Sequence, residues 1–124
     1  MPTDKVFVVM GAVSGFIGVA AGAFGAHFLK DRLAADMLAV FETGTKYQLV
    51  HALALLATAW TAVQYPHPLV RSAGWLFLAG TVVFSGSLYI LAWTSVKAWG
   101  AVTPIGGLLL LAGWLSLAIG VFKA

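Results

Sequence analysis

The chain has 124 residues, of which 61% are hydrophobic and 9% are charged. A soluble domain carries roughly 25% charged residues, so this composition excludes an ordinary water-soluble globule. Seven basic and four acidic residues give a net charge of +3, and the basic residues stand near the ends of apolar runs. This distribution is typical of membrane anchoring and argues against a nucleic-acid-binding patch. The absence of cysteine excludes disulfides and thiol chemistry.

Four runs without Asp, Glu, Lys or Arg follow one another along the chain. Each run is longer than the ~20 residues that cross ~30 Å of hydrocarbon as an α-helix. They predict membrane spans at about residues 6–29, 47–65, 72–96 and 103–122. We therefore expect one membrane domain, residues 1–124, with the fold of an all-α integral membrane protein that forms a four-transmembrane-helix bundle.

The first predicted span is rich in glycine. Gly11 and Gly15 are four residues apart, and so are Gly18 and Gly22, which places the members of each pair on one helix face. Small residues at this spacing let two helix backbones approach closely inside a membrane. We expect these four glycines to serve helix packing.

The polar segment between the first two spans has a helical pattern of its own. Leu33, Met37 and Phe41 recur every four residues. This spacing predicts a short amphipathic interfacial helix over about residues 31–44, lying in the membrane surface. Gly44 is expected to end that helix before the second span begins.

The third predicted span carries two serines near its middle, Ser85 and Ser87. Hydroxyls at such a depth usually bond to their own helix or to a neighbouring one. We favour this role over ion coordination.

Four spans would place both termini on one side of the membrane and the first loop on the other. His27, near the end of the first span, and His51, near the start of the second, would then lie at a similar shallow depth. The candidate ligand or polar cluster on that face consists of His27, Glu42, Tyr47, Gln48 and His51.

This cluster suggests several kinds of site. A metal could be bound by His27, His51 and Glu42, a haem could be held by the two histidines, or the same groups could form a proton or quinone site. Against these, a histidine near an interface commonly bonds to a backbone carbonyl or an acid. No ligand motif supports a particular cofactor, so none is predicted and the metal content is left unknown.

Several separated motifs point to a family. They are Gly22–His27, Phe41–Gly44 running into Tyr47 and Gln48, His51–Leu55, Phe84–Tyr89 and Pro104–Gly107. Together they resemble the YgdD/YwdK-type small membrane proteins, the family called domain of unknown function 423, which also includes vertebrate transmembrane protein 256. The resemblance implies a four-span membrane protein and supplies no catalytic residues.

Two classes of function remain after these exclusions. The first is a non-enzymatic structural or accessory component that associates with itself or with a larger membrane complex through its glycine-rich helix faces. The alternative is a small transporter or a ligand- or cofactor-binding protein that uses the cluster around His27, His51 and Glu42. An enzyme is disfavoured because no nucleophile has a positioned base. We expect the lipid bilayer as partner, no nucleic acid, and a bacterial-type inner or plasma membrane as location.

Overall fold

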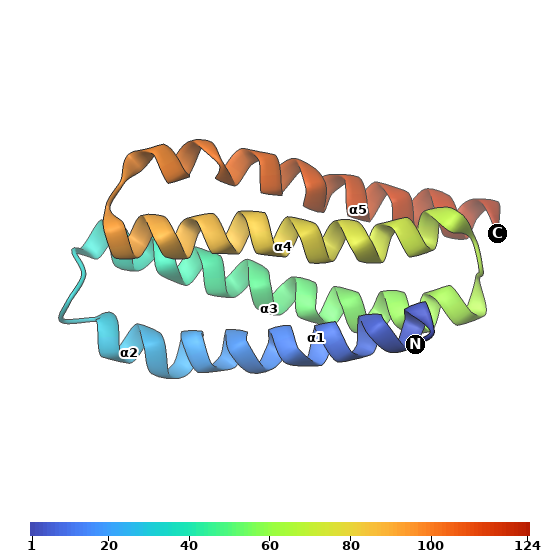
Figure 1. Cartoon of the computed structure of the whole chain (residues 1–124), viewed down its shortest axis with the longest axis horizontal. Helices are drawn as coiled ribbons and strands as arrows, with labels where there is room; N and C mark the ends of the chain where they lie inside the picture. Colours follow the sequence, from blue (N-terminus) through green and yellow to red (C-terminus); the bar gives the residue numbers. More distant parts are fainter.

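The computed structural model describes all 124 residues, and its regular structure is entirely helical (Figure 1). The elements in chain order are α1 (Thr3–Val19), the π-helical turn η1 (Ala20–Gly25), α2 (Ala26–Leu29), α3 (Ala35–Gln64), α4 (Pro68–Thr94), the 3₁₀ turn η2 (Lys97–Ala101) and α5 (Thr103–Lys123). Because η1 continues the helix without a break, α1, η1 and α2 run as one rod. The predicted all-α fold is confirmed.

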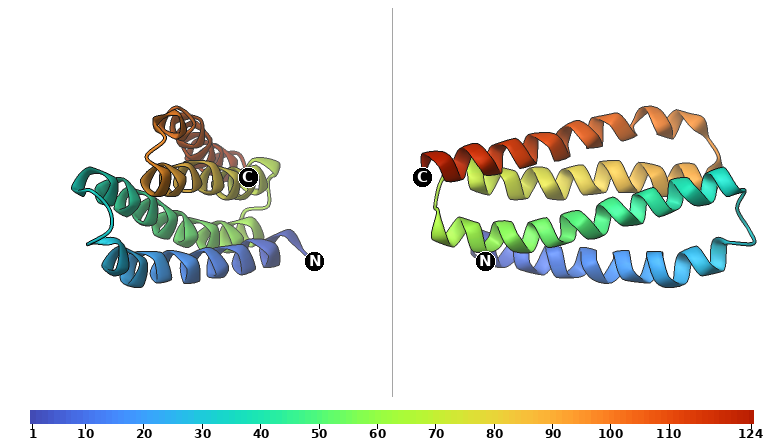
Figure 2. Two further views of the ribbon diagram at one scale, coloured as in Figure 1. Left: turned by 60° about the vertical axis from the view of Figure 1, so that its left-hand side comes forward. Right: turned by 180° about the vertical axis from the view of Figure 1, so that it is seen from behind.

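The long helices lie side by side in the order α1, α3, α4, α5, each antiparallel to the next (Figures 1 and 2). Both termini lie at the end of the molecule that holds the α3–α4 connection (Figure 1). The core between the helices includes Phe7, Leu55, Phe77 and Leu110. The outer helices α1 and α5 each pack mainly on one neighbour, so the row is open at both sides.

Three helical segments are long and apolar enough to cross a membrane: Thr3–Leu29, Pro68–Thr94 and Lys97–Lys123. The 30-residue helix α3 is not among them. Its polar residues Gln48, His51 and Thr58 are buried among the other helices. They lower the apolar character of α3 without facing lipid. By length and apolar composition, α3 is therefore not marked as a fourth crossing.

The predicted interfacial helix does not exist as a separate element. α3 runs without interruption from Ala35 to Gln64, so the predicted end at Gly44 is wrong. Gly44 is buried, and a Cβ atom at this position would lie 2.8 Å from Cε1 of Tyr89 on α4. This glycine is needed for a close helix contact and does not terminate the helix.

The glycines of α1 and η1 contact the same chain. Those predicted for packing all face α3: Gly11, Gly15, Gly18 and Gly22. A Cβ at Gly11 would lie 3.0 Å from the carbonyl oxygen of Ala52, and one at Gly18 would lie 2.7 Å from Leu49. The glycine-rich face of the first span therefore packs on α3 within the same chain.

Candidate ligand-binding groove between α1 and α4

The predicted polar cluster does not come together. His27 and Glu42 are exposed, whereas His51 is buried with 4% of its surface exposed. No three His, Cys, Asp or Glu side chains converge in a way that could hold a metal ion. The hypothesis of a metal site formed by His27, His51 and Glu42 is therefore wrong.

Both ring nitrogens of His51 have partners. Nδ1 lies 2.7 Å from the carbonyl oxygen of Tyr47, and the indole N–H of Trp114 donates to Nε2 over 3.1 Å. A carbonyl can only accept, so Nδ1 carries the hydrogen and Nε2 is the acceptor, which is the neutral tautomer. His51 keeps no free nitrogen for a haem or a metal. It ties α3 to α5.

The other two predicted residues face different neighbours. Tyr47 is 41% exposed, and its ring lies beside His51 and 4.8 Å from the ring of Phe84. Gln48 is buried on the opposite side of α3 and bonds to α1 and α4. One turn of α3 thus supplies side chains to two separate places, because successive residues point about 100° apart around a helix.

The open row of helices leaves a groove on each of its two sides. The α3/α5 groove has a volume of about 290 Å³ and is lined by Tyr47, His51, Phe84, Gly107, Leu110, Leu111 and Trp114. The α1/α4 groove has a volume of about 300 Å³, with Gln48 of α3 among its lining residues. Its polar lining consists of Ser14, Gln48, Thr81, Ser85 and Tyr89.

Most polar atoms in the α1/α4 groove are bonded across helices. The Gln48 amide nitrogen donates to the carbonyl oxygen of Ser14 over 3.0 Å, and the Tyr89 hydroxyl donates to the Gln48 amide oxygen over 2.6 Å. The Ser85 hydroxyl donates to the carbonyl oxygen of Gly44 over 2.7 Å. These three bonds join α1, α3 and α4 and hold the groove's walls in place.

Two hydroxyls in the same groove have no partner: Oγ of Ser14 and Oγ1 of Thr81. Both oxygen atoms are buried, and Thr81 as a whole is only 8% exposed. A buried hydroxyl without a hydrogen bond costs about 1–3 kcal/mol by protein mutational data. Thr81 stands in the middle of α4, about 20 Å from either end, where a membrane offers no water.

Thr81 differs from most other threonines within the helices. Five of them donate to the carbonyl oxygen four residues earlier in the chain: Thr43, Thr58, Thr61, Thr94 and Thr103. This back-bond is the common way for a helix to satisfy a threonine hydroxyl. Thr81 does not make it, although the residue lines the groove. The groove wall therefore contains a buried hydroxyl whose hydrogen-bonding capacity is unused.

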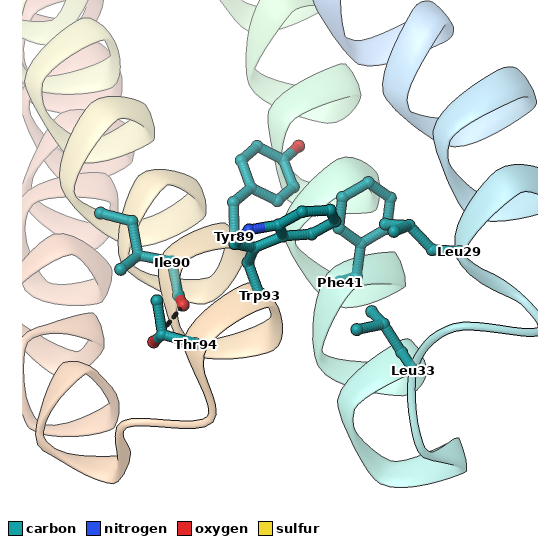
Figure 3. Close-up of a pocket in the computed structure, with 7 residues that line it drawn as sticks. All are labelled: Leu29, Leu33, Phe41, Tyr89, Ile90, Trp93 and Thr94. Atoms are coloured by element: carbon teal, nitrogen blue, oxygen red, sulfur yellow. Dashed lines mark hydrogen bonds between the residues drawn. The ribbon is translucent and has the colours of Figure 1, made fainter.

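A third pocket adjoins the α1/α4 groove. It has a volume of about 350 Å³ and is lined by Leu29, Leu33, Phe41, Tyr89, Ile90, Trp93 and Thr94 (Figure 3). We call it the Trp93 pocket. Tyr89 lines both spaces and stands between them. Two residues that line the Trp93 pocket, Leu29 and Leu33, lie at the end of α2 and in the α2–α3 connection. That connection is at the end of the molecule opposite the termini (Figure 1).

The sequence indicated this site only in part. The prediction for Ser85 and Ser87 is confirmed, since Ser85 bonds to Gly44 and Ser87 to the carbonyl oxygen of Phe84 and the hydroxyl of Thr103. Ser14, Thr81 and Tyr89 were not singled out. In the sequence, each of them appears only as a polar residue inside a charge-free run. Most serine and threonine hydroxyls in such runs bond to their own helix, so this pattern does not indicate a site.

Comparison with known proteins supports the resemblance noted above. Residues 21–107 match the family described as "Protein of unknown function (DUF423)". A UPF0382 membrane protein of Staphylococcus saprophyticus is 48% identical over 123 residues, covering 96% of this chain and 98% of that protein. The UPF0382 membrane protein YwdK of Bacillus subtilis is 41% identical, covering 96% of this chain and 98% of that protein.

A third relative, the UPF0382 inner membrane protein YgdD of Escherichia coli, is 43% identical and covers 98% of this chain and 92% of its own length. No solved structure matches the chain. The relatives' names agree with the three apolar helices in describing a protein embedded in a lipid bilayer. The chain belongs to the DUF423 family of membrane proteins.

Proposed function

We propose that this protein is a non-enzymatic, four-span membrane protein that binds a lipophilic small molecule in the α1/α4 groove. The observation that carries the proposal is the pair of unpartnered hydroxyls, Ser14 and Thr81, on the wall of one groove. A small number of convergent polar groups in a mostly apolar concavity is the usual composition of a ligand site. A bound molecule with matching polar atoms would remove the cost of leaving these hydroxyls unbonded.

The composition of the groove favours binding over catalysis. Its polar side chains are hydroxyls and one amide, with no carboxylate, imidazole or amine among its lining residues. A hydroxyl nucleophile needs a base within hydrogen-bond reach, and the groove supplies none. Proton-coupled transport has equally little support, since no acidic residue lines the groove.

Glycine-mediated association is the weaker candidate. The glycines on which that hypothesis rested, including Gly11 and Gly18, already contact α3 in the same chain. A second copy would have to use a different surface. An accessory role within a complex would therefore depend on contacts other than the glycine faces.

The four-span topology rests on the antiparallel row. Because α1, α4 and α5 are apolar enough to cross the bilayer, α3 must run between the same two ends to connect α1 with α4 (Figure 1). Its buried polar residues face its neighbours. The chain has no cysteine, so single cysteines report topology without background. We expect Ala34→Cys and Gln64→Cys to react with a membrane-impermeant maleimide from opposite sides, and labelling from one side would contradict the crossing.

Mass spectrometry of protein gently extracted from its own membrane tests the binding function. We expect the wild type to carry an additional organic species. The variant Gly86→Phe should lose it, because Gly86 lines the α1/α4 groove, a Cβ there has no neighbour within 4 Å, and the added ring would occupy the groove. Thermal unfolding in detergent checks that this variant is folded.

The matched control is Gly107→Phe. It adds the same ring to the α3/α5 groove, where the nearest atom to a Cβ lies at 3.8 Å. We expect this variant to retain the bound species. A wild type that carries nothing beyond ordinary phospholipid, or a folded Gly86→Phe that retains the species, would overturn the proposed function.

A further inference from the structure

The chemistry of the α1/α4 groove restricts what can bind there. Among its lining residues the only ionisable side chain is Tyr89, whose hydroxyl is already bonded to Gln48. No lining cation could neutralise a phosphate or carboxylate, and no lining anion could pair with an ammonium group. A charged group without a partner is costly in the bilayer interior. A molecule held at this depth must therefore be uncharged.

The hydrogen bonds already made leave a defined requirement. Gln48 uses its amide nitrogen on Ser14 and its oxygen on Tyr89, while Ser85 has given its hydrogen to Gly44. The unpartnered groups are the hydroxyls of Ser14 and Thr81, whose oxygens are covered in this structure. A rotation about χ1 would turn each hydroxyl toward a ligand, to which it has a hydrogen to donate. The ligand must therefore offer oxygen atoms that accept hydrogen bonds, as a carbonyl or an alcohol does.

The Trp93 pocket provides a place for an apolar tail. Six of its seven lining residues are hydrophobic (Figure 3), and it shares Tyr89 with the α1/α4 groove. Thr81 and Trp93 are twelve residues apart on α4, which is about 18 Å along the helix. A molecule that passed the ring of Tyr89 and occupied both spaces would place its head at mid-depth and its tail toward the loop side.

This orientation is the reverse of that of a phospholipid, whose charged head is held at the surface by water and counter-ions. A lipid without a charged head pays no such penalty for burying its head at mid-depth. A head at mid-depth and the absence of charged lining residues thus both favour an uncharged lipid.

We propose that the α1/α4 groove binds an uncharged lipid whose carbonyl or hydroxyl head accepts hydrogen bonds from Thr81 and Ser14, with its tail in the Trp93 pocket. This inference rests on the proposed function and specifies its ligand class. Prenylated quinones carry such carbonyls, and prenyl alcohols carry such a hydroxyl. The two sources share the required chemistry, and binding experiments separate them.

The test measures binding of three probes to the full chain in detergent by native mass spectrometry: decylbenzoquinone, geranylgeraniol and, as a charged control, oleate. We expect the quinone, the alcohol or both to bind and oleate not to compete. Thr81→Val should weaken the binding of the neutral probes about three- to tenfold, the effect of one lost hydrogen bond. Binding of only the quinone identifies a carbonyl ligand, and binding of only the alcohol identifies a hydroxyl ligand.

Two comparisons separate the head contact from the tail contact. Thr58→Val, which removes a buried hydroxyl already bonded to its own helix, should leave binding unchanged. Trp93→Ala should weaken binding of the decyl quinone and leave a tailless benzoquinone unaffected. Equal losses for the two quinones would contradict the assigned tail path.

The outcomes also separate this inference from the proposed function. A native species that is lost in Gly86→Phe but displaced by neither neutral probe would overturn the ligand class and keep the groove as a binding site. Competition by oleate, or neutral binding that Thr81→Val does not weaken, would likewise overturn the ligand class. If Gly86→Phe affects neither the native species nor any probe, both proposals fail.

Discussion

The two grooves of this molecule have nearly the same volume but opposite states of hydrogen bonding. The α3/α5 groove holds the most reactive side chain of the core, His51, and both of its nitrogens are engaged. The α1/α4 groove holds only hydroxyls and an amide, and two of the hydroxyls are free. A residue type that is often functional is thus structural here, and two ordinary hydroxyls mark the candidate site. Unmet hydrogen-bonding capacity is the better guide inside a membrane, where water cannot supply the missing partner.

The largest effect is expected where α5 closes on α4 beside the α3/α5 groove. A Cβ at Gly106 would clash with the backbone of Phe84, so Gly106→Ala must push the two helices apart. We expect a loss of about 1–3 kcal/mol in the free energy of unfolding, as for overpacked cores, measured by SDS titration. Gly107→Ala is the control, since its Cβ would have no atom closer than 3.8 Å. Equal stability of the two variants would refute the close α4–α5 contact.

A smaller loss is expected from His51→Leu. This change leaves the Trp114 indole N–H without its acceptor and removes the bond to the Tyr47 carbonyl oxygen. Hydrogen bonds between membrane helices contribute ~0.6 kcal/mol on average, so the total loss should be about 1–2 kcal/mol. SDS titration provides the measurement, and the variant should still bind the molecule retained by the wild type. Loss of that molecule with normal stability would move the site to the α3/α5 groove.

In the α1/α4 groove, Gly86→Ala should stabilise the protein. Nothing lies within 4 Å of the added methyl group, and alanine is favoured over glycine inside a helix by about 0.5–1 kcal/mol. The expected result is a raised midpoint of thermal unfolding in detergent. A lowered midpoint would mean that the groove is closed in the membrane, and the contrast between the two sides would disappear.

Thr81→Val should also stabilise the ligand-free protein. The substitution preserves shape and removes a buried hydroxyl that has no partner, so the free energy of unfolding should rise by about 1–3 kcal/mol. Thermal unfolding without added lipid measures this value. A large loss of stability would reveal a hidden partner for Thr81 and would remove the main reason for placing a ligand in this groove.

Much of the fold could be predicted because it depends on local composition. Charge-free runs and their flanking basic residues indicated helices that cross a bilayer, and three of the four spans have the length and apolarity that this requires. The division of α3 at Gly44 failed for a physical reason. Glycine lowers helix propensity wherever it stands, and only the position of Tyr89 on another helix explains why α3 needs a glycine there.

The candidate site depended on information that a single sequence lacks. His51 and Thr81 are both polar residues within apolar runs, and nothing nearby in the sequence reveals that Trp114 bonds to one while no group bonds to the hydroxyl of the other. By itself the sequence determined that this protein lies in a membrane, that it is all-helical and to which family it belongs, because these follow from composition and short motifs. Only the tertiary structure decided which polar groups are satisfied, because each hydrogen bond between helices joins residues that are far apart in the chain.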